Sequence, residues 1–119
     1  LIKAIENPYT NILGHPTGRV LLARPGFPLQ MSKILDACKA NGGSIVLNAS
    51  PYRLDLDWRH LYEAMDKGVF VSINPDAHAI AGLRDMEWGV KVGRKGGLLK
   101  ELTLNALPLA DIKHFFAKN

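Results

Sequence analysis

The residues best suited to chemistry in this chain stand directly after short apolar runs. One such run, residues 70–74, stops at a proline and is followed by an Asp-x-His pair, Asp76 and His78. Side chains two apart in an extended backbone point to the same side, so the carboxylate and the imidazole can face one point in space. Carboxylate oxygen and imidazole nitrogen together suit zinc, manganese or iron. The pair predicts part of a metal site just past the end of a strand.

A third metal-type side chain, His15, follows another short apolar run, residues 11–14, where a strand gives way to a loop. In parallel α/β folds, the loops after the carboxyl ends of the strands carry the chemistry. We therefore predict that His15, Asp76 and His78 are ligands of one divalent metal. The alternative interpretation is structural, with a capping aspartate beside surface histidines.

Polar residues that could hold a phosphate lie at the same predicted end of the sheet. Asn48 and Arg53 follow the middle apolar run, and Arg19 follows His15 in the preceding loop. Arginine offers a bidentate fork to a phosphate group, which makes these residues candidates for substrate binding. An Asx-turn at Asn48 and surface ion pairs at the two arginines are the competing structural roles.

The elements that must position these side chains alternate between strand and helix. Apolar patterns predict strands at 11–14, 44–48 and 69–74 and helices at 29–41 and 58–67. This order predicts an α/β fold of parallel β/α units with right-handed crossovers. Only a few strands are available, so the sheet edges are expected to stay open and to favour self-association.

The remainder of the chain reads as mostly helical. Residues 1–7 resemble the end of a helix, and residues 79–86 a helical turn. Residues 87–95 mix strand-like alternation with glycines, and we favour a helix or irregular coil there. Two terminal helices are predicted at 98–106 and 109–118, divided by a proline.

Composition bounds the class of protein. The 119 residues, 47% hydrophobic and 22% charged, are typical of one soluble globular domain. The sequence has no apolar run long enough to cross a membrane and no secretory signal at its start, so we expect a cytoplasmic protein. The single cysteine, Cys38, excludes an internal disulfide and is expected to be a buried thiol. A net charge of +4 only weakly favours an anionic partner, because the basic residues are scattered.

Three motifs resemble one known family. Residues 14–19 (GHPTGR), 48–57 (NASPYRLDLD) and 73–78 (INPDAH) are similar, in order and spacing, to the C-terminal half of a PHP (polymerase and histidinol phosphatase) domain. The version attached to bacterial family X DNA polymerases is the best match, and residues 88–90 (WGV) and 94–97 (RKGG) are similar as well. The resemblance covers residues 1–119, so we interpret the chain as the C-terminal portion of such a domain.

The resemblance implies a fold, a cofactor and an activity. It implies a distorted (β/α) barrel with a cluster of manganese or zinc ions at the carboxyl ends of its strands. In family X polymerases this domain is associated with 3′-5′ exonuclease and related phosphoesterase activity in DNA repair, with DNA as the partner of the parent protein. His15, Asp76 and His78 match metal-ligand positions, and we expect Arg19 and Arg53 to hold the phosphate.

Several features of the family have no counterpart in the chain. The opening His-x-His motif, the middle His and Glu ligands and the polymerase region are absent, and Val46-Leu47 stands where relatives often carry an acidic residue. The parent protein is therefore expected to be an enzyme, but the isolated chain to show little or no catalysis. The alternatives are a PHP-type phosphatase acting on a small phosphomonoester such as histidinol phosphate, and a non-catalytic scaffold module of a polymerase.

Overall fold

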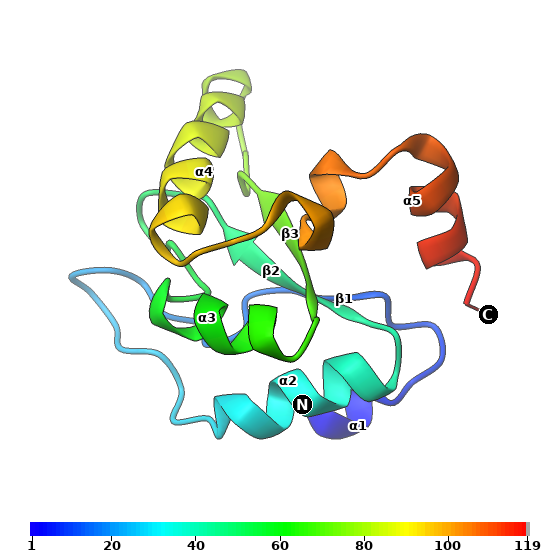
Figure 1. The fold of residues 1–119 in the computed structure, drawn as a ribbon. Helices are drawn as coiled ribbons and strands as arrows, with labels where there is room; N and C mark the ends of the chain where they lie inside the picture. The colour runs from blue at the N-terminus through cyan, green and yellow to red at the C-terminus, as the bar shows by residue number, and fades with distance from the viewer. Residues whose placement is uncertain (119) are drawn as a thin grey trace.

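A parallel sheet forms the centre of the molecule (Figure 1), which the computed structural model describes over residues 1–118. Its three strands, β1 (Ile12–Leu13), β2 (Ser44–Asn48) and β3 (Phe70–Asn74), lie side by side in chain order. Every residue of β2 is buried, as expected for a central strand covered on both faces. The predicted α/β fold with parallel β/α units is confirmed, while the described residues form an open sheet and no closed barrel.

Two helices provide the crossovers between the strands. Helix α2 (Met31–Ala40) joins β1 to β2, and α3 (Arg59–Asp66) joins β2 to β3. Both lie on the same side of the sheet (Figure 1). The predicted helices at 29–41 and 58–67 are confirmed, with each end shortened by one or two residues.

The core forms where one face of the sheet meets these helices. Ile45 is paired in register with Val71, and Leu47 with Ile73, so alternate residues of both strands share one face. All four belong to the buried core, which Leu35 of α2 and Leu61 of α3 complete from the helical side. Burying each such side chain contributes roughly 1.5–3 kcal/mol, which holds the strand ends in place.

Helix α4 (Met86–Lys95) packs closely on the sheet. It follows the 3₁₀ helix η1 (Ile80–Asp85), which confirms the helical turn expected at 79–86. Gly89 and Gly93, one turn apart, are the buried residues of α4. A Cβ atom at Gly89 would lie 2.5 Å from Cγ2 of Ile73, so the glycine is what permits this approach.

The segment after α4 differs from the prediction. A single helix over 98–106 is wrong, because two short 3₁₀ helices, η2 (Lys100–Leu102) and η3 (Leu104–Ala106), stand there instead, interrupted at Thr103. Thr103 forms a parallel bridge with Val71 at the edge of β3. The backbone leaves the helical path because it meets the unpaired peptide groups of this edge strand.

The side chain of Asn105 also covers the edge of β3. Oδ1 of Asn105 accepts a hydrogen bond from the N–H of Ile73 at 2.8 Å, and its Nδ2 donates to the Ile73 carbonyl at 2.9 Å. The amide of Asn105 thus replaces a neighbouring strand at this point. The expected self-association through open sheet edges would have to displace Asn105 here.

The first and last helices pack against different elements. Helix α1 (Ile2–Ile5) contacts α2, and α5 (Leu109–Phe116) places the ring of Phe115 5.5 Å from the ring of Phe70. Both helices were predicted, α5 ending two residues before the expected position. None of the helices in the described part of the chain has the length and apolar character needed to cross a membrane.

Cys38 of α2 is expected to resist thiol reagents. Burial raises the pKa of its thiol to about 11, against a smaller lowering effect from the nearby Lys118 ammonium. Since the ordinary value is 9.0, the thiolate fraction at pH 8 should be about 100-fold lower in the folded chain than in the unfolded one. Ellman's reagent should therefore label the native chain at least that much more slowly than the chain in guanidinium. Equal rates would contradict the burial of this thiol.

Candidate functional site

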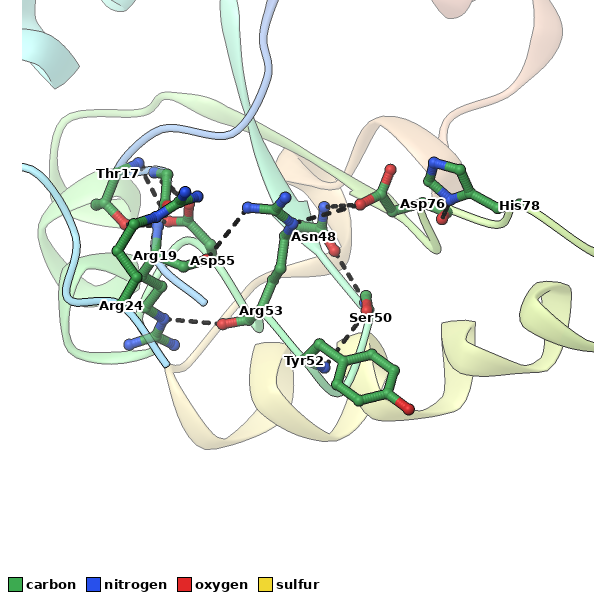
Figure 2. Close-up of polar contacts among 11 residues, drawn as sticks. Thr17, Arg19, Arg24, Asn48, Ser50, Tyr52, Arg53, Asp55, Asp76 and His78 are labelled. Carbon is green, nitrogen blue, oxygen red and sulfur yellow. Dashed lines mark hydrogen bonds and ion pairs between the residues drawn. The ribbon is translucent and has the colours of Figure 1, made fainter. Parts of the chain in front are cut away.

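The candidate site lies past the carboxyl ends of β2 and β3 (Figure 2). Asn48 is the last residue of β2 and is 3% exposed. Its Nδ2 donates a hydrogen bond to Oδ2 of Asp76 at 3.1 Å, which ties the segment after β3 to the end of β2. The N–H of Ala49 donates to the Asn74 carbonyl at 2.7 Å, so strand pairing continues up to the site.

The carboxylate of Asp76 also faces a cation. Nε of Arg53 lies 3.6 Å from Oδ2 of Asp76, and both side chains are about one quarter exposed. Asp76 has a positive φ of 56°, a conformation that aspartate tolerates better than most residues. The turn after Pro75 thereby directs the carboxylate of Asp76 toward Asn48 and Arg53. The sequence predicted all three residues for this end of the sheet.

The imidazole of His78 lies against the same turn. Its Nδ1 is 2.7 Å from the main-chain oxygen of Asp76, so this nitrogen carries the proton and donates to the carbonyl. The Nε2 atom then has the free lone pair that a metal or a proton would use. Asp76, Arg53 and His78 border one cavity of about 340 Å³, whose wall is completed by Val20, Ser50, Tyr52, Ala77, Gly82 and Asp85.

His15 does not join this cavity. It is exposed, has a positive φ of 45°, and is absent from the cavity lining. Within residues 1–118, no group of three or more His, Cys, Asp or Glu side chains lies close enough to hold a metal ion. The structure thus places Asp76 and His78 together but does not assemble the three predicted ligands. The described residues alone do not fit a complete metal site.

Asn48 and Arg53 adopt the structural roles that competed with phosphate binding. Oδ1 of Asn48 accepts a hydrogen bond from the N–H of Ser50 at 2.9 Å, which is an Asx-turn. The Arg53 side chain pairs with Asp76, and its Nη1 donates to the Arg19 carbonyl at 3.3 Å. No described residue accepts a hydrogen bond from its Nη2, so one edge of this guanidinium is left for a ligand.

The guanidinium of Arg19 is engaged within the protein. Its Nε donates to the Arg53 carbonyl at 2.8 Å, its Nη1 to Oδ2 of Asp57 at 2.9 Å, and its Nη2 to the Leu54 carbonyl. These bonds span the loop from Arg53 to Asp57. Arg19 therefore holds the loop that carries Arg53, and its predicted contact with a phosphate would require it to leave these partners.

A buried aspartate that the sequence reasoning missed completes the connection between the two loops. Asp55 is fully buried, and its Oδ1 accepts a hydrogen bond from Oγ1 of Thr17 at 2.9 Å. Its Oδ2 accepts from the N–H groups of Thr17 and Gly18, at 3.1 and 3.0 Å. The available signal was an acidic residue between Leu54 and Leu56, because a carboxylate in an apolar stretch must find internal partners.

Asp57 stabilises the start of α3 from a position just before the cap. Trp58 is the N-cap, and Oδ1 of Asp57 accepts a hydrogen bond from the N–H of Arg59 at 2.9 Å. Burial would raise the pKa of Asp57, but that hydrogen bond and the guanidinium groups of Arg19 and Arg59 outweigh it and hold the pKa below its usual value.

We expect the lowered pKa of Asp57 to make the stability of the chain depend on pH in the acidic range. A carboxyl group whose pKa falls on folding makes its full contribution to the free energy of unfolding above its unfolded pKa, about 3.9. This contribution is lost as the pH falls through the pKa of the folded state. Asp57→Asn should therefore unfold at lower urea than wild type at pH 7, and the difference should shrink between pH 4 and pH 2. Asp66→Asn, at an exposed position without an ion pair among the described residues, is the control. A pH-independent difference for Asp57→Asn would contradict the expectation.

Comparison with known proteins places this chain beside polymerases and phosphatases. No protein-family model matches it. The chain is 38% identical, over all of its 119 residues, to the DNA polymerase/3′-5′ exonuclease PolX of Bacillus subtilis. It is also 30% identical over 111 residues to a probable phosphatase of Thermoanaerobacter sp., and 28% identical over 111 residues to one of Caldanaerobacter subterraneus.

The relatives are longer than the chain. It spans 21% of the polymerase and 43% and 41% of the two phosphatases, while these matches cover 100%, 88% and 88% of the chain. The similarity thus includes the motifs at 14–19, 48–57 and 73–78. It confirms the resemblance of this chain to part of a PHP domain, as attached to a bacterial family X DNA polymerase.

Proposed function

We propose that the chain contributes to metal-dependent 3′-5′ exonuclease hydrolysis of DNA phosphodiesters, as part of the PHP domain of a bacterial family X DNA polymerase. One observation carries the proposal: the chain is similar, from end to end, to a protein named as both a DNA polymerase and a 3′-5′ exonuclease. Since the chain spans 21% of that relative, the remaining parts of the parent protein would supply the polymerase.

The geometry of the cavity supports a phosphate ligand. Arg53 borders it and keeps the Nη2 edge of its guanidinium without a partner among the described residues. A guanidinium edge matches two oxygens of a phosphate group, and a cation here would offset the charge that develops on the phosphoryl group. We assign phosphate binding to Arg53 rather than to Arg19, whose donors hold the loop.

The same cavity offers two donors to a divalent ion. The carboxylate of Asp76 and Nε2 of His78 are of the type that manganese and zinc accept, and such an ion would activate water for attack on the phosphorus. A functional centre needs at least one further ligand, and His15 or residues of other parts of the parent protein would have to provide it. The isolated chain should therefore hydrolyse phosphodiesters poorly.

A chimera tests this proposal. Because all 119 residues align with the B. subtilis polymerase, the matching segment of that protein can be replaced by this chain. We expect the chimera to degrade single-stranded DNA from its 3′ end in manganese, and Asp76→Ala and His78→Ala to lower the rate at least about 100-fold. His114→Ala, at an exposed position of α5, is the matched histidine control.

The outcomes separate the three functions considered. Matching circular dichroism spectra and thermal transitions of the chimera and the unmodified polymerase report that the exchanged segment folds, so a folded chimera without exonuclease would refute the proposal. Hydrolysis of p-nitrophenyl phosphate but not of DNA would favour a phosphatase of small phosphomonoesters. Unchanged DNA binding without any hydrolysis would favour a scaffold. Exonuclease loss with His114→Ala as large as with Asp76→Ala would remove the assignment of the site.

A further inference from the structure

One large, mostly exposed side chain of the candidate cavity is aromatic. Tyr52 borders the cavity together with Arg53, Asp76 and His78, yet its residue surface is 74% exposed. Figure 2 shows the ring projecting from the loop after β2, away from the buried Asp55. No aromatic or cation–π partner is found for it among the described residues. Most of the Tyr52 surface is therefore accessible to a ligand.

The backbone of Tyr52 is fixed although its ring is free. Its carbonyl accepts a hydrogen bond from the N–H of Leu21 at 2.7 Å, and its own N–H donates to Oγ of Ser50 at 3.4 Å. The next residue is tied down as well, since the N–H of Arg53 donates to the Ser50 carbonyl at 2.9 Å. A ring on a fixed backbone loses little conformational freedom when a planar ligand stacks on it.

The neighbouring residue supplies a different kind of contact. Arg53 directs its guanidinium toward Asp76, while the Tyr52 ring projects in another direction from the same loop (Figure 2), so one short segment presents both an apolar plane and a cation. A nucleotide has the matching chemistry, because its base has an aromatic face and its phosphate an anionic one. An inorganic phosphate or a base-free sugar phosphate would use Arg53 only.

We propose that Tyr52 is a stacking platform for the nucleobase of a nucleotide whose phosphate lies beside Arg53. The inference rests on the proposed function, because it concerns the same cavity, and it makes Tyr52 the residue that selects nucleotides over other phosphate esters. Stacking of one base on an aromatic side chain strengthens binding by about tenfold and tolerates every base. The platform therefore selects for the presence of a base and not for its sequence.

Equilibrium binding to the 119-residue chain tests the platform without any hydrolysis. The probes are a short oligothymidylate, the same oligomer with abasic residues at its 3′ end, thymidine monophosphate and inorganic phosphate. The two oligomers carry equal charge, so the net charge of +4 on the protein affects both equally. Tyr52→Ala removes the ring, Tyr52→Phe keeps it, and Tyr9→Ala is the control at a tyrosine that is 81% exposed near the start of β1.

We expect wild type to bind the base-bearing oligomer about tenfold more tightly than the abasic one, and Tyr52→Ala to abolish this preference. Tyr52→Phe and Tyr9→Ala should retain it. Tighter binding of the oligomer than of thymidine monophosphate would identify a DNA end as the source of the base, and equal binding a free nucleotide. Absence of a base preference in wild type, its survival in Tyr52→Ala, or its loss in Tyr52→Phe would overturn the inference.

This experiment and the chimera fail independently. The isolated chain could show a Tyr52-dependent preference for bases while the chimera lacks exonuclease activity. That result would support the stacking platform and refute the proposed activity. An active chimera whose chain shows no such preference would do the reverse. Matching circular dichroism spectra of Tyr52→Ala and wild type show that the ring, and not the fold, was removed.

Discussion

Asp55→Ala is expected to lower the free energy of unfolding by about 3–5 kcal/mol, the largest effect of a single substitution near the site. Its carboxylate accepts hydrogen bonds from Oγ1 and the N–H of Thr17 and from the N–H of Gly18. Without it, the buried N–H of Gly18 and the partly buried donors of Thr17 lose their acceptor, and each unsatisfied buried group costs about 1–3 kcal/mol. Urea unfolding followed by circular dichroism measures the loss.

Graded variants keep this expectation testable if Asp55→Ala does not fold. Asp55→Asn retains one acceptor oxygen and should be less damaging, while Thr17→Ala removes one hydrogen bond and should cost about 1 kcal/mol. In a double-mutant cycle, the effects of Asp55→Asn and Thr17→Ala should not add, because they break the same contact. Asp66→Ala, at an exposed position, should change little. Additive effects, or a loss below 1 kcal/mol in Asp55→Ala, would show that this carboxylate does not connect the loops.

The convergence of Asn48, Arg53 and Asp76 was predictable because it depends on local patterns and one general rule. The apolar runs define β2 and β3, and parallel strands that lie side by side end at the same edge of the sheet. Any polar residues directly after both strands must then be neighbours. The ion pair of Arg53 with Asp76 and the hydrogen bond from Asn48 follow from this placement.

The role of Asp55 could not be read from the sequence because its partners are distant along the chain. Thr17 and Gly18 lie 38 and 37 residues before it, and nothing in either segment specifies the other. The same holds for Asn105, whose side chain pairs with the backbone of Ile73 across 32 residues. A helix at 98–106 was a reasonable prediction from the local pattern, but the unpaired edge of β3 decided the conformation.

The position of His15 shows a similar limit. Its place after β1 predicted that it would lie near Asp76 and His78, yet β1 spans only Ile12–Leu13 and is separated from β3 by β2. The ends of adjacent strands lie close together at a shared edge of the sheet. The ends of strands that are two positions apart meet only if the sheet is curved. Three strands without a closed barrel do not bring these three side chains into one group.

Gly89→Ala should destabilise the chain by about 2–3 kcal/mol, although alanine favours helix by about 1 kcal/mol over glycine. The new Cβ atom would lie 2.5 Å from Cγ2 of Ile73 and 2.6 Å from Cβ of Ala49, closer than carbon atoms approach. Helix α4 would have to move away from the sheet, because Ala49 offers no flexible side chain that could rotate aside. Thermal unfolding measures the loss, and Gly14→Ala, where a Cβ atom meets nothing within 4 Å, is the matched control.

Gly89→Ala should also change the geometry of the candidate site. Ala49 directly follows Asn48 at the end of β2, and Ile73 lies three residues before Asp76. A helix displaced from these two residues changes the distance between Asn48 and Asp76, which are joined by one hydrogen bond of 3.1 Å. We therefore expect Gly89→Ala to weaken nucleotide binding as well as stability, whereas Gly14→Ala should affect neither. If Gly89→Ala instead raised the unfolding temperature, helix propensity would outweigh packing, and α4 would not be held against the sheet as closely as its glycines indicate.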